Sequence, residues 1–182
     1  MAKLVSKTYG DALFDLGIET STIDELYNEV SAFGDVLNSN LEFRDLMSHP
    51  QISKEDKKSI IEKTLKDSFS SDLIGFVMIV LEKDRFDDMN LIIDYFVSRY
   101  KEYKNIGIIQ ISSAYDLDAK AKSKIEDKLL QTTKYDSLEC EYIVDESLIA
   151  GLKIKIGDKI VDSTISTRLN QMSSDLYNIQ LI

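Results

Sequence analysis

The chain has 182 residues, and its 22 Lys and Arg against 32 Asp and Glu give a formal net charge of −10. This acidic excess argues against nucleic-acid binding and against electrostatic attraction to anionic lipid, because both depend on Lys and Arg. One Cys and one His exclude an internal disulfide, a Cys-cluster metal site and zinc motifs that need paired His.

No segment has the pattern of a targeting signal or a membrane anchor. The start of the chain lacks an apolar run of signal-peptide length. The longest apolar stretch, 73–81, is much shorter than the about 20 residues that span a bilayer. We therefore expect the chain to reside in a reducing compartment and to reach a membrane only through a partner.

The amino-terminal part of the chain is predicted to be helical. The whole sequence contains a single Pro and 7 Gly, so helix breakers are few. Thr22 with Glu25, and Ser53 with Asp56, have the spacing of amino-terminal helix caps. Apolar residues at spacings of three and four predict helices over 4–17, 22–38, 41–48, a segment that starts at Ser53, 72–84 and 88–103.

Segment 72–84 is apolar on nearly all sides. This pattern fits the most buried helix of a bundle. It fits equally a helix that shows one apolar face to a partner. The first predicted helix, where Gly10 and Ala12 lie among larger apolar residues, leaves the same two alternatives open.

The carboxy-terminal part has a different pattern, which begins near 105–107. Asp118 is a predicted helix N-cap, and Gly157 is placed to supply the positive φ of a two-residue hairpin turn. The expected elements are a strand at 106–111, a helix at 118–132, a strand at 138–144, hairpin strands at 152–156 and 159–161, and a helix at 163–178.

These elements predict a fold that is α+β overall. An all-α six-helix bundle is expected over residues 1–104, followed by a small α/β domain over 105–182. No Gly-, Ser- or Pro-rich linker separates the two, so they are expected to be joined closely.

The motifs contain no convincing catalytic or nucleotide site. Segment 151–159 is the nearest to a phosphate-binding loop, but Asp158 separates Gly157 from Lys159 and the residues alternate as in a strand. A hairpin is therefore the better interpretation. The acidic cluster at 84–88 lacks the central Gly of a calcium loop and is typical of solvated helix ends, and Asp145 with Glu146 carries no stronger signal.

The single His and the single Cys also have simple structural interpretations. His49 precedes Pro50 and is expected at a helix end, where an imidazolium would suit the helix dipole. Cys140 lies in the alternating segment and is expected to be a core thiol. We predict no catalytic residue, no metal ligand and no cofactor, and expect a protein that works by binding.

Four segments resemble one known family. Residues 9–14 are similar to its Tyr-Ala-x-Ala-Leu-Phe opening, 43–52 to its Phe-x-x-Leu-x-x-Pro-x-Ile segment, and 81–86 to the end of its fifth helix. Residues 144–165 resemble its signature Asp-x-Ser-Leu-Ile-Gly-Gly-x-x-Ile-x-x-Gly-Asp-x-x-x-Asp-x-Ser-Ile. The family is the δ subunit of bacterial F-type ATP synthases, the counterpart of the mitochondrial oligomycin-sensitivity-conferring protein. The departures are Gly10 for Ala, Glu146 for Pro, Ala150 for Gly and Thr164 for Ser.

The resemblance implies a non-catalytic stator subunit that joins the catalytic head to the peripheral stalk. Its helical domain is expected to hold the amino-terminal helix of an α subunit in a groove between its first and fifth helices. Its carboxy-terminal part is expected to meet the b subunits of the stalk. The implied groove residues are Tyr9, Ala12, Leu13 and Leu16 on one side and Phe76, Ile79 and Val80 on the other.

The resemblance also implies a peripheral location at the cytoplasmic face of the bacterial membrane, with one copy per complex and no bound cofactor. The final helix, with Ile165, Leu169, Met172 and Leu176 on one stripe, has two possible roles. It can cover its own sheet, which we favour because a small sheet needs a cover, or join the stalk. The alternative to the whole interpretation is a free-standing helical adaptor unrelated to ATP synthase.

Overall fold

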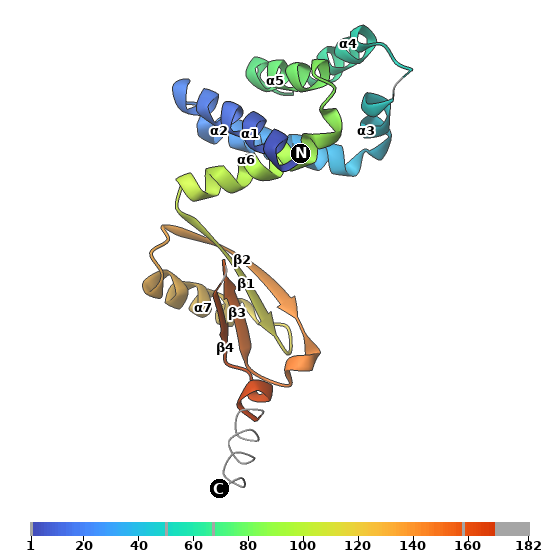
Figure 1. Ribbon diagram of the computed structural model, residues 1–182. Coiled ribbons are helices and arrows are strands. Elements are labelled where there is room, and N and C mark those ends of the chain that lie inside the picture. Colours follow the sequence, from blue (N-terminus) through green and yellow to red (C-terminus); the bar gives the residue numbers. More distant parts are fainter. Residues whose placement is uncertain (1, 50, 67, 158, 170–182) are drawn as a thin grey trace, which may run out of the picture. The chain divides into compact units, whose positions relative to one another are not determined.

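The computed structural model describes residues 2–49, 51–66, 68–157 and 159–169 (Figure 1). Helices and a sheet make the fold α+β, as the sequence predicts. The chain divides between Tyr100 and Lys101 into two compact units, Met1–Tyr100 (unit 1) and Lys101–Ile182 (unit 2).

Unit 1 is built from helices, and each segment with a predicted helical period contains one. Figure 1 shows α1 and α2 side by side, with α4 and α5 forming a second pair. The elements are α1 (Ala2–Glu19), α2 (Ile23–Ser39), α3 (Leu41–Ser48), α4 (Lys54–Leu65), α5 (Ser71–Glu82), the 3-10 turn η1 (Phe86–Asp88) and α6 (Met89–Tyr103), the last of which contains the division between the units.

The core of unit 1 is formed by residues from several helices that lose all contact with solvent. Their burial is the main force that holds the helices together, because helices of this length are marginal alone. The fully buried residues include Val30 and Leu37 of α2, Ile61 of α4, Val77 and Val80 of α5, and Ile92 and Phe96 of α6.

Two of the helix starts are capped by serine. The Ser53 hydroxyl accepts the Asp56 N–H, as predicted for α4. The Ser70 hydroxyl accepts the Leu73 N–H at the start of α5 and donates to the Glu29 carboxylate of α2, which ties the two helices together. Such caps satisfy N–H groups that have no partner within the helix.

The capping box predicted at Thr22 is wrong. Thr22 is the N-cap of α2, but its hydroxyl makes no capping bond; it lies 2.6 Å from the hydroxyl of Thr20 instead. The backbone of Thr22, with φ of −112° and ψ of 19°, departs from the extended conformation in which an N-cap side chain usually accepts from the first turn.

The helix predicted to run to 84 ends earlier. Asp84 has φ of 54°, and its N–H bonds to the Leu81 carbonyl while the Arg85 N–H bonds to the Val80 carbonyl. This pair of bonds closes a helix around one left-handed residue. α5 therefore stops at Glu82, and the chain turns into η1.

Unit 2 contains a sheet of order β2-β1-β3-β4. β1 pairs in parallel with β2 and antiparallel with β3, and β3 and β4 form the predicted hairpin, in which Gly157 has φ of 55°. The elements are β1 (Ile106–Ser113), α7 (Ala119–Thr132), β2 (Ser137–Val144), the 3-10 turn η2 (Glu146–Leu148), β3 (Leu152–Ile156), β4 (Lys159–Asp162) and helical residues 165–169.

Helix α7 covers one face of this sheet. Asp118 caps the helix, as predicted, by accepting the Ala121 N–H. The Tyr142 hydroxyl on β2 donates to the Glu126 carboxylate of α7 over 2.8 Å. Ile109 and Ile111 of β1 share this face and are fully buried, so the core of unit 2 lies between the central strand and α7.

Two similar turns lie on either side of the β3–β4 hairpin. The Asp145 carboxylate accepts both the N–H and the hydroxyl of Ser147, and the Asp162 carboxylate accepts the same two groups of Thr164. These bonds lower the pKa of both carboxyl groups below their usual value because they stabilise the ionised form. The Asp-x-Ser and Asp-x-Thr positions of the family signature are thus turn-forming groups.

Ile149 lies between these two turns on an unusual backbone. Its φ of 60° and ψ of −57° place it at the centre of a three-residue turn, which the Ala150 N–H closes on the Leu148 carbonyl. Its side chain is 67% exposed. A β-branched residue in this conformation is strained.

Two helical glycines lie in opposite environments. A Cβ at Gly10 of α1 would lie 2.4 Å from Cδ1 of Tyr95, whereas one at Gly75 of α5 would meet nothing within 4 Å. We expect Gly75→Ala to stabilise the chain by about 0.5–1 kcal/mol, since Ala is the better helix former. Gly10→Ala is expected to destabilise it by about 1 kcal/mol net, because overpacking outweighs that gain. Urea denaturation measures both.

If the two substitutions shift the urea midpoint in the same direction, the close approach of α1 to Tyr95 does not constrain position 10. A third variant, Gly10→Ala with Tyr95→Ala, separates crowding from other causes. When Tyr95 is replaced by alanine, the methyl group introduced at position 10 should no longer lower the free energy of unfolding, because the ring that it would meet is absent.

Removing the Ser147 hydroxyl should raise the pKa of Asp145. That hydroxyl is the largest contribution to the lowered pKa, ahead of the Ser147 N–H. A lowered folded-state pKa stabilises the fold above the unfolded-state pKa, and this stabilisation is lost as the pH falls through the folded-state pKa. Ser147→Ala should therefore reduce the acid dependence of stability. Carboxylate-resolved NMR titration measures the pKa, and an equal rise at Asp162 would contradict a local cause.

Candidate functional site

The residues that the structure describes contain no group of three or more His, Cys, Asp or Glu side chains arranged to hold a metal ion. The segment that was compared with a phosphate loop forms β3 and β4, which confirms the hairpin. Asp158, the other residue of its predicted turn, lies outside the described residues. This segment is therefore an ordinary hairpin and does not have the form of a phosphate-binding loop.

The single His and the single Cys of the chain lie far apart in sequence and in different units. His49 is exposed at the end of α3, as predicted, and its Nδ1 accepts the Gln51 N–H. Cys140 is half-buried on β2, and burial, followed by the Glu126 carboxylate, raises the pKa of its thiol. A thiol held in its protonated form is a poor nucleophile.

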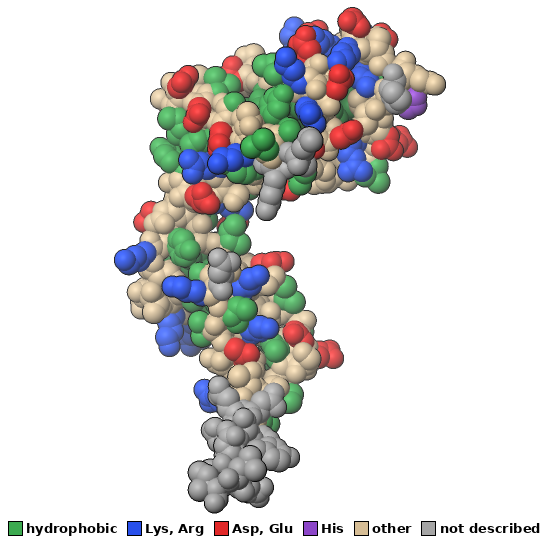
Figure 2. Space-filling view, in the orientation of Figure 1, with side chains coloured by type: hydrophobic (Ala, Val, Ile, Leu, Met, Phe, Trp, Pro, Cys, Tyr) green, Lys and Arg blue, Asp and Glu red, His purple; other side chains and the backbone are tan. Residues whose placement is uncertain are grey.

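The side chains expected to form a groove between the first and fifth helices lie on α1 and α5. The Tyr9 ring meets the Phe76 ring edge-on, with centroids 6.5 Å apart. Aromatic pairs favour this geometry. Figure 2 shows hydrophobic side chains, interrupted by charged ones, over the part of unit 1 where these helices lie.

The residues of this α1–α5 seam fall into two groups. Leu13, Phe76 and Val80 are 2%, 9% and 0% exposed and belong to the core. Ala12 and Ile79 are exposed, and Tyr9 and Leu16 are half-buried, so these four side chains offer an apolar surface. Ile79 is 52% exposed on a helix that is otherwise mostly buried.

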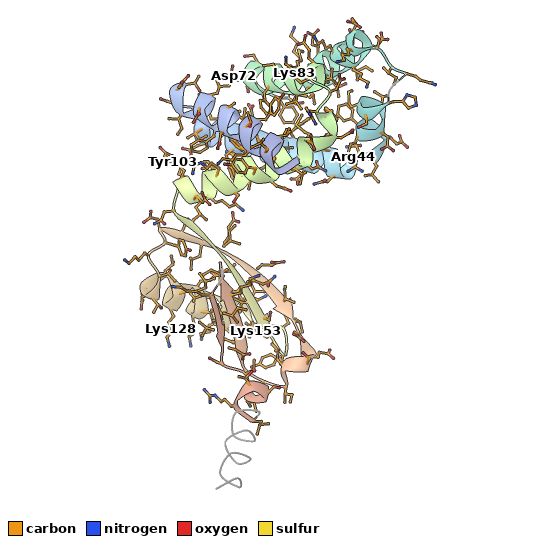
Figure 3. The ribbon with its side chains drawn as sticks, viewed as in Figure 1. Arg44, Asp72, Lys83, Tyr103, Lys128 and Lys153 are labelled. Atoms are coloured by element: carbon orange, nitrogen blue, oxygen red, sulfur yellow. The ribbon has the colours of Figure 1, made fainter. Side chains whose placement is uncertain are left out.

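Charged groups lie beside the seam and restrain its helices. The Tyr95 hydroxyl of α6 donates to the Asp11 carboxylate, and the Arg99 Nε lies 3.9 Å from the same carboxylate. The two contacts hold α1 against α6. Asp72 and Lys83 mark the two ends of α5 in Figure 3.

A hollow on the α4 side of α5 was not predicted. It has a volume of about 520 Å³ and is lined by Glu62 and Lys66 of α4, by Phe69 and Ser71, and by Ile74, Gly75 and Met78 of α5. The sequence feature that could have predicted this hollow is Gly75 within a mostly apolar helix, because a residue without a side chain leaves space beside its larger neighbours.

Unit 2 has its own apolar surface. Burial and the hydrogen bond to the Glu126 carboxylate raise the pKa of Tyr142, so its hydroxyl remains a donor to α7. The predicted final helix begins at 165, and Ile165 and Leu169 are 44% and 54% exposed. Met172 and Leu176, which complete its predicted stripe, lie outside the described residues.

Within the described part of the chain, no helix combines the length and the hydropathy that a membrane crossing needs.

Comparison with known proteins gives a match over nearly the whole chain. The family profile described as "ATP synthase delta (OSCP) subunit" matches residues 5–176. A protein of Lachnoclostridium phytofermentans named ATP synthase subunit delta is 45% identical, with both chains covered completely. One of Acetivibrio thermocellus with the same name is 32% identical over 92% of this chain and 94% of its own length.

A solved structure has the same fold. A chain in the mitochondrial ATP synthase hexamer of Toxoplasma gondii matches with a TM-score of 0.73 and 17% identity, covering 94% of this chain and 97% of that one. The likeness in structure concerns the fold, while the sequence matches cover both the helical part and the signature at 144–165. The chain therefore belongs to the ATP synthase delta (OSCP) subunit family.

Proposed function

We propose that residues 1–104 bind the catalytic head of an F-type ATP synthase and that residues 105–182 contact its peripheral stalk. As a member of its family, the chain is a non-catalytic stator subunit of that stalk. The full-length match is the observation that carries the proposal. It leaves the alternative, a free-standing helical adaptor, without support.

The proposed contact with the head is the α1–α5 seam, and its occupant is the amino-terminal helix of an α subunit. An amphipathic helix needs an apolar surface, and Tyr9, Ala12, Leu16 and Ile79 supply one. Each Å² of apolar area buried there contributes about 25 cal/mol. The surface is therefore suited to a helix with a matching apolar stripe.

The buried members of the seam have a supporting role in this proposal. Leu13, Phe76 and Val80 fix the separation of α1 and α5 because they are packed in the core. A rigid surface loses little conformational entropy when a partner binds. The same packing transmits force from the bound helix to the whole of unit 1.

The proposed mechanism is mechanical. Rotation of the rotor exerts torque on the catalytic head, and a link to a fixed stalk prevents the head from turning with it. Hydrophobic burial suits this link because it is non-directional and tolerates small displacements without losing individual bonds. The chain needs two separate surfaces for this task, one on each unit.

The second surface is proposed to lie on unit 2 and to contact the b subunits. The chain then lies, as one copy per complex, at the cytoplasmic face of the membrane and is held there through its partners. The residues of unit 2 with exposed apolar side chains, such as Ile165 and Leu169, support a role in binding.

The head contact is tested by isothermal titration of the full chain with a synthetic peptide of the α subunit's amino-terminal helix from the same organism. We expect one-to-one binding that Ala12→Asp and Ile79→Asp each weaken by about tenfold or more, because a carboxylate would be buried against the apolar face of the peptide. Both residues are exposed, so the fold should persist, which circular dichroism checks.

Two matched variants control for charge. Ala32→Asp changes an exposed alanine on α2, and Leu91→Asp changes a 48% exposed residue on α6. Neither should weaken binding by more than about twofold. Binding that survives both seam variants would move the site elsewhere, and no binding by the unaltered chain would refute the head contact.

A further inference from the structure

Helix α7 covers only part of its face of the sheet. Over the β2 side, the Tyr142 hydroxyl bonds to Glu126 and closes the contact. Over β3 there is a hollow of about 440 Å³, whose apolar lining is Ile125 and Leu129 of α7 and Leu152 and Ile154 of β3. We call this hollow the α7–β3 groove.

The groove continues along α7 toward the loop before it. A second hollow, of about 290 Å³, shares Ile125 and Leu152 with the first and adds Leu117 and Tyr115. Tyr115, one of the residues that line this second hollow, is 65% exposed. The two hollows therefore form one elongated apolar surface.

Exposure changes across the sheet on this face. Ile111 of the central strand is fully buried, whereas Ile154, its partner on β3, is half-buried. Val161, which pairs with Ile154 from β4, is 54% exposed. Paired residues point to the same side of a sheet, so the apolar face loses its cover in the order β1, β3, β4.

The charges at the groove have one sign. Lys124 and Lys128 line it, and Lys159 of β4 shares its face through the pair with Ile156. Figure 3 labels Lys128 on α7. Among the described residues that line the groove there is no Asp or Glu, and no described carboxylate pairs with Lys124 or Lys128. This is notable in a chain of net charge −10.

We propose that the α7–β3 groove is the docking site for a stalk helix of the b subunit that carries an apolar stripe flanked by Asp or Glu. The apolar lining would take the stripe, and Lys124 and Lys128 would pair with the acidic flank. The inference rests on the proposed contact of unit 2 with the b subunits, and it adds the location and the chemistry.

The size of the groove supports a helix as occupant. The five residues of β3 extend over roughly 16 Å, which corresponds to about three turns of helix. Complementary charge steers a partner helix and fixes its direction, while apolar burial supplies most of the affinity.

The test titrates the full chain with the soluble coiled coil of the same organism's b subunit. Lys124→Glu with Lys128→Glu should weaken binding by about tenfold or more, because the rim would then repel an acidic flank. Lys134→Glu with Lys155→Glu makes the same change in net charge away from the groove and should weaken binding by no more than about twofold.

Isoleucine methyl NMR of the same titration locates the contact. The signals of Ile125 and Ile154 should shift on binding, while those of Ile108 and Ile160, on the opposite face of the sheet, should stay. Shifts confined to the opposite face would overturn the inference. The inference would also be overturned if the Ile154 methyl group contacts residues 170–182 in the free chain. The same holds if dimerisation of the chain abolishes the shifts, because in both cases the groove has another occupant.

The two proposals fail in different ways. If both pairs of substitutions weaken binding equally, or if neither pair weakens it, the α7–β3 groove is not the docking site, while the contact of unit 2 with the b subunit still stands. If the unaltered chain does not bind the coiled coil at all, the stalk contact of unit 2 is refuted. The proposal that a b-subunit helix occupies the groove is then refuted as well.

Discussion

Unit 1 depends on the burial of α5. This helix supplies residues to the core from most of its circumference, and Val77 and Val80 lose all contact with solvent. Ile79 lies between them in sequence and is 52% exposed, so one strip of the same helix remains available. A helix fixed in this way can carry load, because displacing its exposed strip would also disturb the tightly packed core. The stability of the unit and the surface that we propose for binding thus both depend on this helix.

Local chemistry made much of the fold predictable. Ser53 and Asp118 cap the helices that they were expected to cap, and Gly157 has the positive φ that the hairpin requires. The prediction failed at Thr22, where the backbone conformation does not match that of a usual N-cap and the hydroxyl contacts Thr20 instead. Helical periodicity also left open how far the apolar residues of the seam are buried. It shows which residues share a stripe, but only packing decides that Val80 is buried and Ile79 is not.

The two turn-forming aspartates of the family signature are not among the residues proposed to bind. The signature around Asp145 and Asp162 is specific because each carboxylate must accept two bonds from a residue two positions later. Docking surfaces such as the seam and the α7–β3 groove consist of ordinary apolar residues and lysines, whose types are common in any protein. The most specific part of the resemblance therefore contains these turns, whereas the α7–β3 groove became visible only in the structure, where α7 leaves part of its sheet face uncovered.

The close approach at Gly10 links the residue at position 10 to the residue at position 95. The space that a methyl group would need is filled by the Tyr95 ring, which the Asp11 carboxylate holds in place. A methyl group at position 10 would require the ring to shift, and a shift of the ring would disturb its hydrogen bond to Asp11. Replacements at positions 10 and 95 are therefore expected to depend on each other rather than to add independently.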